Sequence, residues 1–292
     1  MYMNENKLPV SVVIVTYKTR DLTRKALESL FSSSSLPEQV IVVDNSSQDG
    51  TAEMIKNEFP NVSLIGSKEN LGFAKGNNKG ISEAATQPYV WLLNSDTETG
   101  KNTLEELVAY MEKHPDVGAL GPQMMYPDKS LQSAGGYFPS IFNVFYYLFP
   151  VAYFLPISWR VRLKSIALFP QPIPQNGLDV DYVTGAAVLL RRAALDQVGL
   201  MSEDYFMYFE ETDMCWRMKK AGWKIRVIST EPVMHVYGGS FKSKYDKKRL
   251  TLFQESLAIF VKKNFSGLTK NLILLELRCF GALSIFLKKF KK

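Results

Sequence analysis

The sequence has few of the features that are typical of secreted proteins or of proteins stabilised by a structural metal. Only two of its 292 residues are cysteines, Cys215 and Cys279, and their spacing fits neither a disulfide framework nor a metal site. Two isolated cysteines are typical of a protein in a reducing compartment. No repeat or low-complexity tract is present, and 46% hydrophobic and 22% charged residues are ordinary values for a globular protein.

Long hydrophobic runs are also absent. The apolar run at 10–15 is too short for a secretory signal, and no small-residue cleavage site follows it. Residues 141–157 carry no charge, but two prolines interrupt them, and a spanning helix needs about 20 apolar residues. Residues 271–287 contain two charged side chains, so we expect an interfacial helix there. These patterns predict a cytoplasmic protein.

Acidic residues are scarce in the C-terminal part of the chain. Residues 241–292 contain 13 Lys and Arg against 3 Asp and Glu, a balance of +10. Residues 1–240 carry −4, which gives the net charge of +6. A basic amphipathic segment is typical of binding to an anionic membrane surface or a nucleic acid, and a solvated helical face is the alternative.

Two nucleotide-binding signatures are missing. The first predicted strand ends in V-T-Y at 15–17 without the G-x-G-x-x-G turn, which argues against a nicotinamide or flavin enzyme. No G-x-x-x-x-G-K-[ST] segment occurs, so a P-loop ATPase is excluded.

The first half of the chain alternates apolar runs and amphipathic segments at the spacing of βαβ units. The predicted strands are 10–16, 39–44, 62–66, 89–94 and 117–120, and the predicted helices are 21–31, 49–59, 73–85 and 104–113. This order predicts an α/β fold with a doubly wound, mostly parallel sheet flanked by helices.

The second half is less regular. Residues 124–176 are rich in aromatics and proline and predict an insertion or long loops. After them we expect a strand at 180–190, a helix at 210–221 and a strand at 224–228. A basic amphipathic helical extension ends the chain.

The most informative segment is Asn94-Ser95-Asp96-Thr97, which ends the apolar strand on one carboxylate. Ligands of open α/β sheets bind just beyond the carboxyl ends of such strands. An aspartate there can hold a divalent cation against a substrate phosphate. Capping of the following helix is the alternative interpretation of Asp96.

Two other segments carry candidate nucleotide contacts. Asp44, at the end of the second strand, could accept the imide N–H of a uracil or thymine ring, and an Asx turn is the alternative. The glycine-rich segment at 70–80 lets the backbone approach a ligand, and Lys75 favours an anion. A helix start that tolerates glycine is the alternative for that segment.

Seven collinear segments resemble the family 2 glycosyltransferases with the GT-A fold, especially their rhamnosyltransferase-like branch. The segments are VSVVIVTY (10–17), VVDNSSQDG (42–50), NLGFAKGNN (70–78), LLNSDT (92–97), VTGAAVLLRR (183–192), YFEETDMCWR (208–217) and HVYGGS (235–240). The resemblance covers most of residues 8–265. It implies a nucleotide-sugar donor, a bound Mg²⁺ or Mn²⁺ and transfer with inversion at the anomeric carbon.

The resemblance also assigns residues to the donor. Six of them would contact the nucleotide: Thr16, Tyr17 and Asp44 at the nucleoside, and Gly72, Lys75 and Asn77 in the segment that lines it.

For the metal, the resemblance points to Asp96 and His235. Asp96 occupies the last position of the family's D-x-D site, which ligates the metal on the diphosphate, and Asn94 stands at the first acidic position. A cation held by one carboxylate would be bound mostly through substrate phosphate and water. His235 matches a position that can supply a further ligand, and a structural histidine is the alternative.

Glu210 and Glu211 stand where the family has an acidic pair before a helix. Inverting transfer needs a carboxylate that takes the proton of the acceptor hydroxyl, and we expect Glu211 in this role, with Glu210 second. The alternative is that both stabilise the dipole of the helix, with Asp213 and Arg217 as a surface pair.

These observations predict an inverting, metal-dependent glycosyltransferase of cell-surface glycan synthesis. We expect residues 8–240 to form the GT-A domain, with a nucleotide-sugar half at 1–122 and an acceptor half at 123–240, followed by a basic helical tail at 241–292. The expected donor is a nucleoside-diphosphate sugar, and rhamnose is a candidate for the sugar. Because of Asp44, we expect UDP or dTDP as the nucleotide in preference to GDP.

The expected acceptor is a lipid-linked glycan or polysaccharide at the inner face of the cell membrane, with the tail on anionic lipid and no nucleic-acid partner. The alternatives are a sugar nucleotidyltransferase on a related fold and a non-catalytic carbohydrate-binding protein.

Overall fold

The computed structural model describes residues 7–84, 87–148, 159, 164–168, 170–236 and 247–289, with side chains described up to residue 281. Three sequence features extend beyond these ranges. The end of the segment at 235–240, the uncharged stretch after Leu148 and the first six residues of the basic tail lie outside the described residues.

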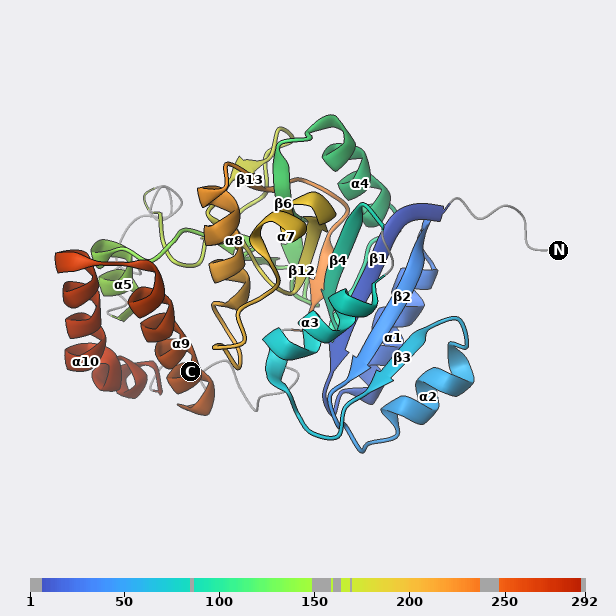
Figure 1. The fold of residues 1–292 in the computed structure, drawn as a ribbon, viewed down its shortest axis with the longest axis horizontal. Coiled ribbons are helices and arrows are strands. Elements are labelled where there is room, and N and C mark those ends of the chain that lie inside the picture. The colour runs from blue at the N-terminus through green and yellow to red at the C-terminus, as the bar shows by residue number, and fades with distance from the viewer. Residues whose placement is uncertain are drawn as a thin grey trace.

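An eight-stranded, mostly parallel sheet forms the centre of the molecule (Figure 1). Its strand order is β10-β13-β6-β12-β4-β1-β2-β3. The strands are β1 (Lys7–Thr16), β2 (Leu36–Asp44), β3 (Ser63–Gly66), β4 (Tyr89–Asn94), β6 (Val117–Gly121), β10 (Leu178–Asp179), β12 (Ala187–Arg191) and β13 (Lys224–Val227). β1, β2, β3 and β4 run parallel, whereas β12 runs antiparallel between β4 and β6.

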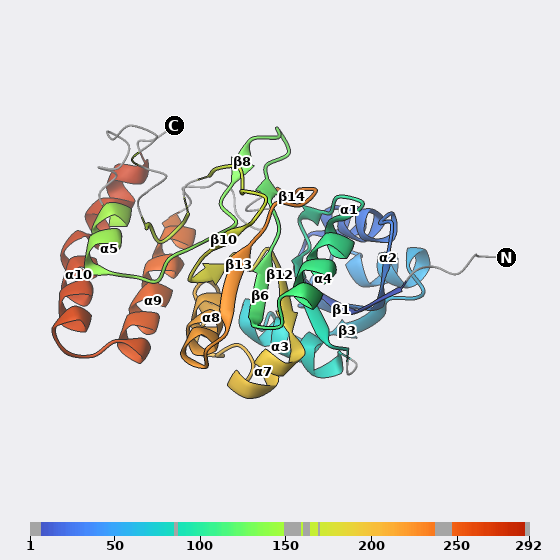
Figure 2. The ribbon, with the colours of Figure 1, turned by 90° about the horizontal axis from the view of Figure 1, so that it is seen from above.

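Helices cover both faces of this sheet (Figure 2). On one face lie α1 (Arg20–Phe31), α2 (Thr51–Glu58) and α4 (Thr103–Lys113), and on the other lie α3 (Gly72–Glu83), α7 (Arg192–Val198) and α8 (Glu210–Lys220). This arrangement confirms the predicted doubly wound sheet flanked by helices. Its physical basis is simple, because strands as apolar as β4, buried from Tyr89 to Leu93, need cover on both sides.

Close packing of α3 on the sheet requires small residues. A Cβ at Gly80 would lie 2.3 Å from a methyl group of Val13 in β1, so a larger residue there would push the helix off the strand. The glycine-rich segment therefore serves helix–sheet packing along most of its length.

The predicted strand at 180–190 is wrong in one respect, because it is divided into two strands with a turn between them. β11 (Tyr182–Val183) leaves the central sheet and pairs with β9 (Gly135–Gly136). The chain then turns at Thr184, whose carbonyl accepts from the N–H of Ala187 at 3.4 Å, and continues as β12. The apolar pattern runs across the turn, since Val183, Ala186 and Ala187 are all buried, so periodicity could not show the turn.

A four-stranded sheet beside the central one brings distant segments together. It consists of β5 (Thr97–Glu98), β14 (Val233–His235), β7 (Met124–Met125) and β8 (Leu131–Gln132), in the order β5-β14-β7-β8. His235 in β14 is paired with Thr97 in β5, so this sheet places the histidine beside the segment that follows β4.

A second apolar core lies at the end of the molecule away from the N terminus. Here α5 (Ile141–Leu148), α9 (Lys247–Asn264) and α10 (Gly267–Lys289) lie side by side (Figures 1 and 2). Tyr205 and Phe209, just before α8, pack into this core. The predicted helical extension is confirmed, whereas the division of the chain at residue 240 stays a prediction. No helix in the described part of the chain is long and apolar enough to cross a membrane.

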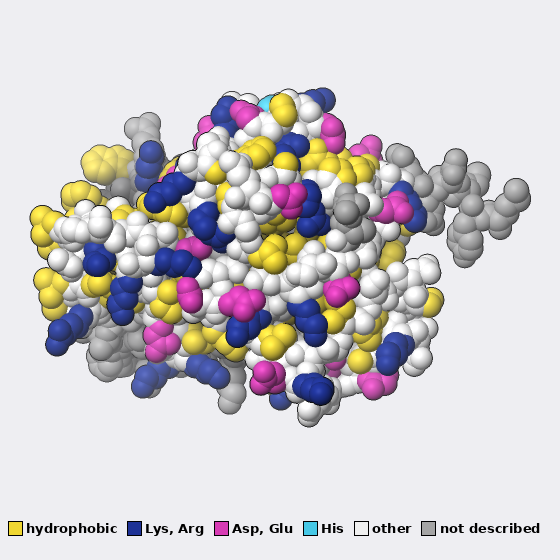
Figure 3. Space-filling view, viewed as in Figure 1, with side chains coloured by type: hydrophobic (Ala, Val, Ile, Leu, Met, Phe, Trp, Pro, Cys, Tyr) yellow, Lys and Arg dark blue, Asp and Glu magenta, His cyan; other side chains and the backbone are white. Residues whose placement is uncertain are grey.

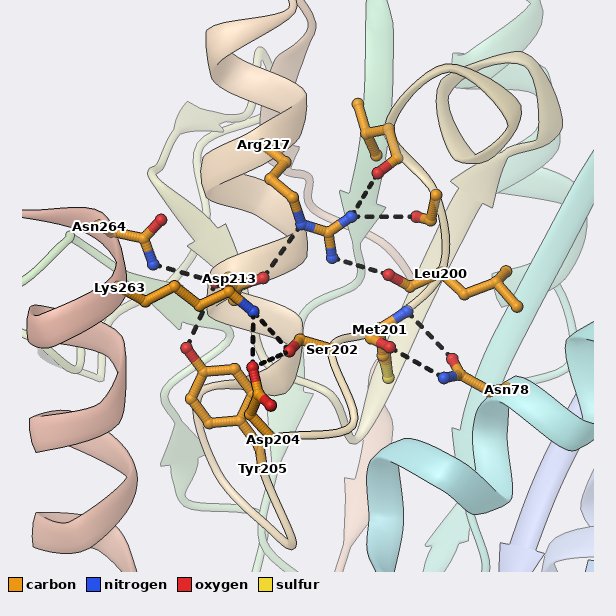
Figure 4. Close-up of polar contacts among 12 residues, drawn as sticks. Asn78, Leu200, Met201, Ser202, Asp204, Tyr205, Asp213, Arg217, Lys263 and Asn264 are labelled. Atoms are coloured by element: carbon orange, nitrogen blue, oxygen red, sulfur yellow. Dashed lines mark hydrogen bonds and ion pairs between the residues drawn. The ribbon is translucent and has the colours of Figure 1, made fainter.

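A buried carboxylate ties this second core to the rest of the molecule (Figure 4). Asp213 in α8 is fully buried and accepts hydrogen bonds from Arg217 Nε at 3.0 Å, Asn264 Nδ2 at 3.0 Å and Tyr205 Oη at 3.3 Å. Arg217 also donates to three backbone carbonyls at 198–200. The alternative interpretation of Asp213 and Arg217 as a surface pair is therefore wrong, because α9 and the loop before α8 cover Asp213.

Candidate active site

A cavity of about 220 Å³ opens where β1 and β4 end. Its described walls are the ends of these strands, the start of α3, the turn before β12, residues 206–211, and one residue each from β14 and α9. Six of the ten predicted site residues line it: Tyr17, Gly72, Asp96, Glu210, Glu211 and His235. The position agrees with the rule that ligands of open α/β sheets bind beyond the carboxyl ends of strands.

Asp96 and His235 form one side of the cavity. Their facing atoms, Asp96 Oδ1 and His235 Nε2, are 3.2 Å apart. On the other edge of the ring, His235 Nδ1 lies 2.7 Å from Oε1 of Gln132, an atom that can only accept, so Nδ1 carries the proton. In the neutral imidazole, Nε2 then presents a lone pair to the Asp96 carboxylate.

Two acceptor atoms at this distance require a proton or a cation between them. Carboxylate oxygen and imidazole nitrogen are both ligands of Mn²⁺, and Gln132 fixes the ring as an outer partner of a metal ligand does. The residues therefore fit a divalent cation. Among the described residues, no cluster of three or more His, Cys, Asp or Glu side chains is placed to hold a metal ion.

The alternative interpretation of Asp96 as a helix cap is not supported. The next helix, α4, begins at Thr103 after Asn102, and β5 lies between it and Asp96. Asp96 instead sits in a tight turn closed by Thr97 Oγ1, which donates to the Asn94 carbonyl at 2.7 Å.

Glu210 and Glu211 lie on the same cavity at the start of α8. Glu210 is buried, with 3% of its surface exposed, and its Oε2 has no hydrogen-bond partner. Burial raises the pKa of both carboxyls, that of Glu211 to about 7. The two groups are hydrogen-bonded to each other, which raises the pKa of Glu210 further and opposes the rise at Glu211. The two carboxyls therefore titrate as a pair, and burial keeps a proton on this pair near neutral pH.

The backbone just before this pair is in an unfavourable conformation. Tyr208 and Phe209 have φ values of +71° and +68°, in the left-handed region that residues other than glycine seldom adopt. Helix α9 holds this segment: Ser256 Oγ donates to the Met207 carbonyl at 2.8 Å, and Arg249 Nε donates to Tyr208 Oη at 2.9 Å. Strain that persists in this way is typical of functional sites.

The predicted nucleotide contacts divide into two groups. Tyr17 and Gly72 line the cavity. Gly72 has φ +80°, and a Cβ there would lie 2.7 Å from the carbonyl oxygen of Phe206, so only glycine lets α3 begin against this wall.

The other four predicted contacts do not line the cavity. Thr16 is buried among hydroxyls, 2.8 Å from that of Thr23. Asp44 accepts from the Ser47 N–H at 3.0 Å, three residues on, so it makes a local bond to the backbone, as the alternative interpretation expected, although not the two-residue bond of an Asx turn. Asn77 is buried and donates to the Phe73 carbonyl, and Lys75 is exposed.

Asn45 and Arg249 are among the lining residues that were missed from the sequence. Asn45, beside Asp44, connects the second strand to the glycine-rich segment: its side chain donates to the Gly72 carbonyl at 3.0 Å and accepts from the Leu71 N–H at 3.3 Å. It lies inside the VVDNSSQDG segment, so its position was available as a signal. Arg249 lies in α9, in a part of the chain that was assigned to a surface tail, and no local signal marked it.

Comparison with known proteins gives one family. The sequence profile of glycosyl transferase family 2 matches residues 11–199. The N-acetylglucosaminyl-diphospho-decaprenol L-rhamnosyltransferase of Mycobacterium tuberculosis is 29% identical over 266 residues, which are 88% of this chain and 85% of the relative.

Solved structures of similar fold have lower sequence identity. The mannosyltransferase PcManGT of Pyrobaculum calidifontis, in complex with GDP-Man and Mn²⁺, has a TM-score of 0.61 at 16% identity, over 96% of this chain and 73% of its own. S. aureus TarS 1-349 in complex with UDP has a TM-score of 0.54 at 17% identity, over 92% of this chain and 70% of its own. These likenesses confirm the GT-A fold.

The buried carboxyl pair predicts an unusual dependence of stability on pH. Because both pKa values are raised in the folded state, the native protein binds more protons than the unfolded chain between about pH 4.5 and about pH 7, and its stability falls as pH rises through this window. We expect a Glu210→Gln, Glu211→Gln double variant to gain stability relative to wild type, on the order of 1–3 kcal/mol, between about pH 5 and about pH 8 in urea unfolding.

A surface carboxylate provides the control. Hydrogen bonding to Arg24 lowers the pKa of Glu58, so that carboxylate is ionised at both pH values. The Glu58→Gln variant should therefore differ from wild type equally at the two pH values. A double variant that behaves like Glu58→Gln would contradict the shared proton.

Proposed function

This chain belongs to glycosyl transferase family 2 and is a glycosyltransferase, and we propose that it transfers a sugar with inversion from a nucleoside-diphosphate donor to a hydroxyl of a lipid-linked glycan acceptor. Family membership distinguishes it from a nucleotidyltransferase or a carbohydrate-binding protein. The observation that carries the proposal is the cavity itself, where Glu211, Asp96 and His235, from distant segments, line one space.

The base in this proposal is Glu211. Inversion requires the acceptor oxygen to attack the anomeric carbon from the face opposite to the leaving group while a base takes its proton. Glu211 lines the cavity, and a pKa of about 7 leaves it both ionised and basic near neutral pH. Glu210 would be a positioning residue, because its carboxyl is buried and hydrogen-bonded to that of Glu211.

Asp96 and His235 would hold the divalent cation. When bound, it would neutralise charge on the departing diphosphate. Two protein ligands suit an ion whose remaining positions are filled by phosphate oxygen and water. The Mn²⁺ in the mannosyltransferase complex supports this assignment, as does the mixed carboxylate and imidazole ligand set.

The proposed donor is a UDP- or dTDP-sugar, with rhamnose as the candidate sugar. The sugar follows from the name of the mycobacterial relative, which also motivates a lipid-diphosphate acceptor. The pyrimidine nucleotide was predicted from Asp44, which does not line the cavity, so its remaining support is the UDP complex of TarS. We place donor binding in the half at 1–122 and acceptor binding in the half at 123–240 of the domain at 8–240.

The second core provides a surface for the proposed membrane contact. Phe142 on α5 and Leu268 and Leu275 on α10 are 77%, 73% and 54% exposed. In the sequence of α10, Lys270 follows Leu268 by two residues and Arg278 follows Leu275 by three. In Figure 3, yellow hydrophobic and dark blue basic side chains alternate over this end of the molecule. Apolar side chains beside Lys and Arg are typical of helices that lie on anionic lipid, so we place the enzyme at the inner membrane face.

Donor and metal binding can be tested together by thermal shift. A ligand that binds only the folded protein raises its melting temperature. We expect stabilisation by UDP- or dTDP-sugars, strengthened by Mn²⁺ and lost in Asp96→Ala. GDP-sugars should shift the melting temperature less. A wild-type protein that none of these ligands stabilises at saturating concentration would contradict the proposed donor class.

The assignment of Glu211 as the base predicts that substitutions at Glu211 and Glu210 lower activity to different extents. We expect Glu211→Gln to lower kcat by about 100- to 10,000-fold, the usual worth of a general base. The pH profile of wild-type kcat should rise through about pH 7, because below it Glu211 is protonated and cannot accept the acceptor's proton. Glu210→Gln should cost less, since the amide can still donate to Glu211. Comparable activity in Glu211→Gln and wild type would refute the assignment.

Membrane contact predicts loss of vesicle binding on removal of the exposed apolar side chains. We expect a Phe142→Ser, Leu268→Ser, Leu275→Ser variant to bind phosphatidylglycerol vesicles at least about tenfold more weakly than wild type in flotation. Leu200→Ser is the control, because Leu200 is exposed but lies in the loop after α7 and belongs to neither α5 nor α10. Equal flotation of all three proteins would remove the membrane contact from the proposal and leave the enzymatic activity in place.

A further inference from the structure

The charges around the cavity are unevenly distributed. Three carboxyl groups line it: Asp96, Glu210 and Glu211. Among the described lining residues, Arg249 alone carries a permanent positive charge. A nucleoside diphosphate brings at least two negative charges into this space, so a site that binds it needs more than one cation.

Arg249 reaches the cavity from the second core. It is the third residue of α9, and only 7% of its surface is exposed. Its Nε–H donates to Tyr208 Oη at 2.9 Å, which orients the guanidinium along the strained segment before Glu210. A guanidinium has five N–H donors in a planar fork, so it can hold this tyrosine and also bind an oxyanion.

The lysine predicted to bind the anion does not compete for this role. Lys75 is exposed on α3 and does not line the cavity. A buried guanidinium also binds phosphate more strongly than an exposed ammonium, because it is bidentate and less screened by solvent.

From this geometry we propose that Arg249 binds the diphosphate of the donor and stabilises the departing nucleoside diphosphate. The inference rests on the proposed function. In the transfer, the acceptor oxygen forms the new bond to the anomeric carbon, and its proton goes to Glu211. The bond between that carbon and the diphosphate oxygen breaks, and its electron pair stays on the diphosphate, where Arg249 and the metal would neutralise the charge.

The experiment measures affinity for free UDP and dTDP by calorimetry with Mn²⁺ present, together with kcat for transfer. We expect Arg249→Gln to weaken binding of the preferred nucleoside diphosphate by about 10- to 100-fold, since charge-assisted hydrogen bonds to phosphate are lost. Affinity for the nucleoside alone, followed by NMR titration, should change by less than about twofold. Arg249→Lys should recover part of the loss, because it restores charge without the fork.

Two control variants distinguish diphosphate binding by Arg249 from a general effect of positive charge and from support of the loop before Glu210. Lys247→Gln removes one positive charge from an exposed position of the same helix turn, and we expect its affinity to stay within about twofold of wild type. Ser256→Ala removes the α9 hydrogen bond to the Met207 carbonyl, in the segment before Glu210, and leaves Arg249 in place. If Ser256→Ala weakens nucleoside diphosphate binding as much as Arg249→Gln does, Arg249 only supports the loop and the inference is wrong.

The outcomes also distinguish this inference from the proposed function. A wild-type protein that binds no nucleoside diphosphate contradicts the proposed function. A wild-type protein that binds one, with an Arg249→Gln variant of equal affinity, refutes only the role of Arg249. Circular dichroism of each folded variant excludes loss of affinity through unfolding.

Discussion

The buried carboxylate of Asp213 is the interaction on which the candidate active site depends. A carboxylate that is fully buried is costly unless it is paired and hydrogen-bonded, and here three side chains from three segments meet that need. Arg217 in turn binds the carbonyls at 198–200, and Asn264 belongs to the end of α9. One charge thus fixes α8, the loop before it and a C-terminal helix relative to one another.

This fixed frame explains how the chain tolerates two costly features next to each other. Tyr208 and Phe209 occupy the left-handed region, and Glu210 has a buried oxygen without a partner. Each would relax if the segment could move. The aromatic packing of Tyr205 and Phe209 in the second core, with the contacts from α9, prevents that movement. The raised pKa of the acidic pair is therefore a property of the packing around it.

The C-terminal helices α9 and α10, which form part of the second core, have two roles in the proposed enzyme. Their inner side packs against the residues before α8 and brings Arg249 to the cavity. Their outer side exposes large apolar side chains among basic ones, as helices on a lipid surface do. A lipid-linked acceptor held at such a surface would lie on the same helices that support the catalytic wall, which couples acceptor delivery to the geometry of the base.

The sequence by itself determined the sheet, its helices and the strand ends where Asp96 lies, because apolar runs and their polar ends are local patterns that also decide burial. It also placed Glu210 and Glu211 at a helix start. Only the tertiary structure decided that Asp213 is buried, that the strand at 180–190 breaks, and that Arg249 reaches the cavity. These depend on contacts between residues far apart in the chain, here α9 against the loop before α8, and no local periodicity records which distant surface covers a residue.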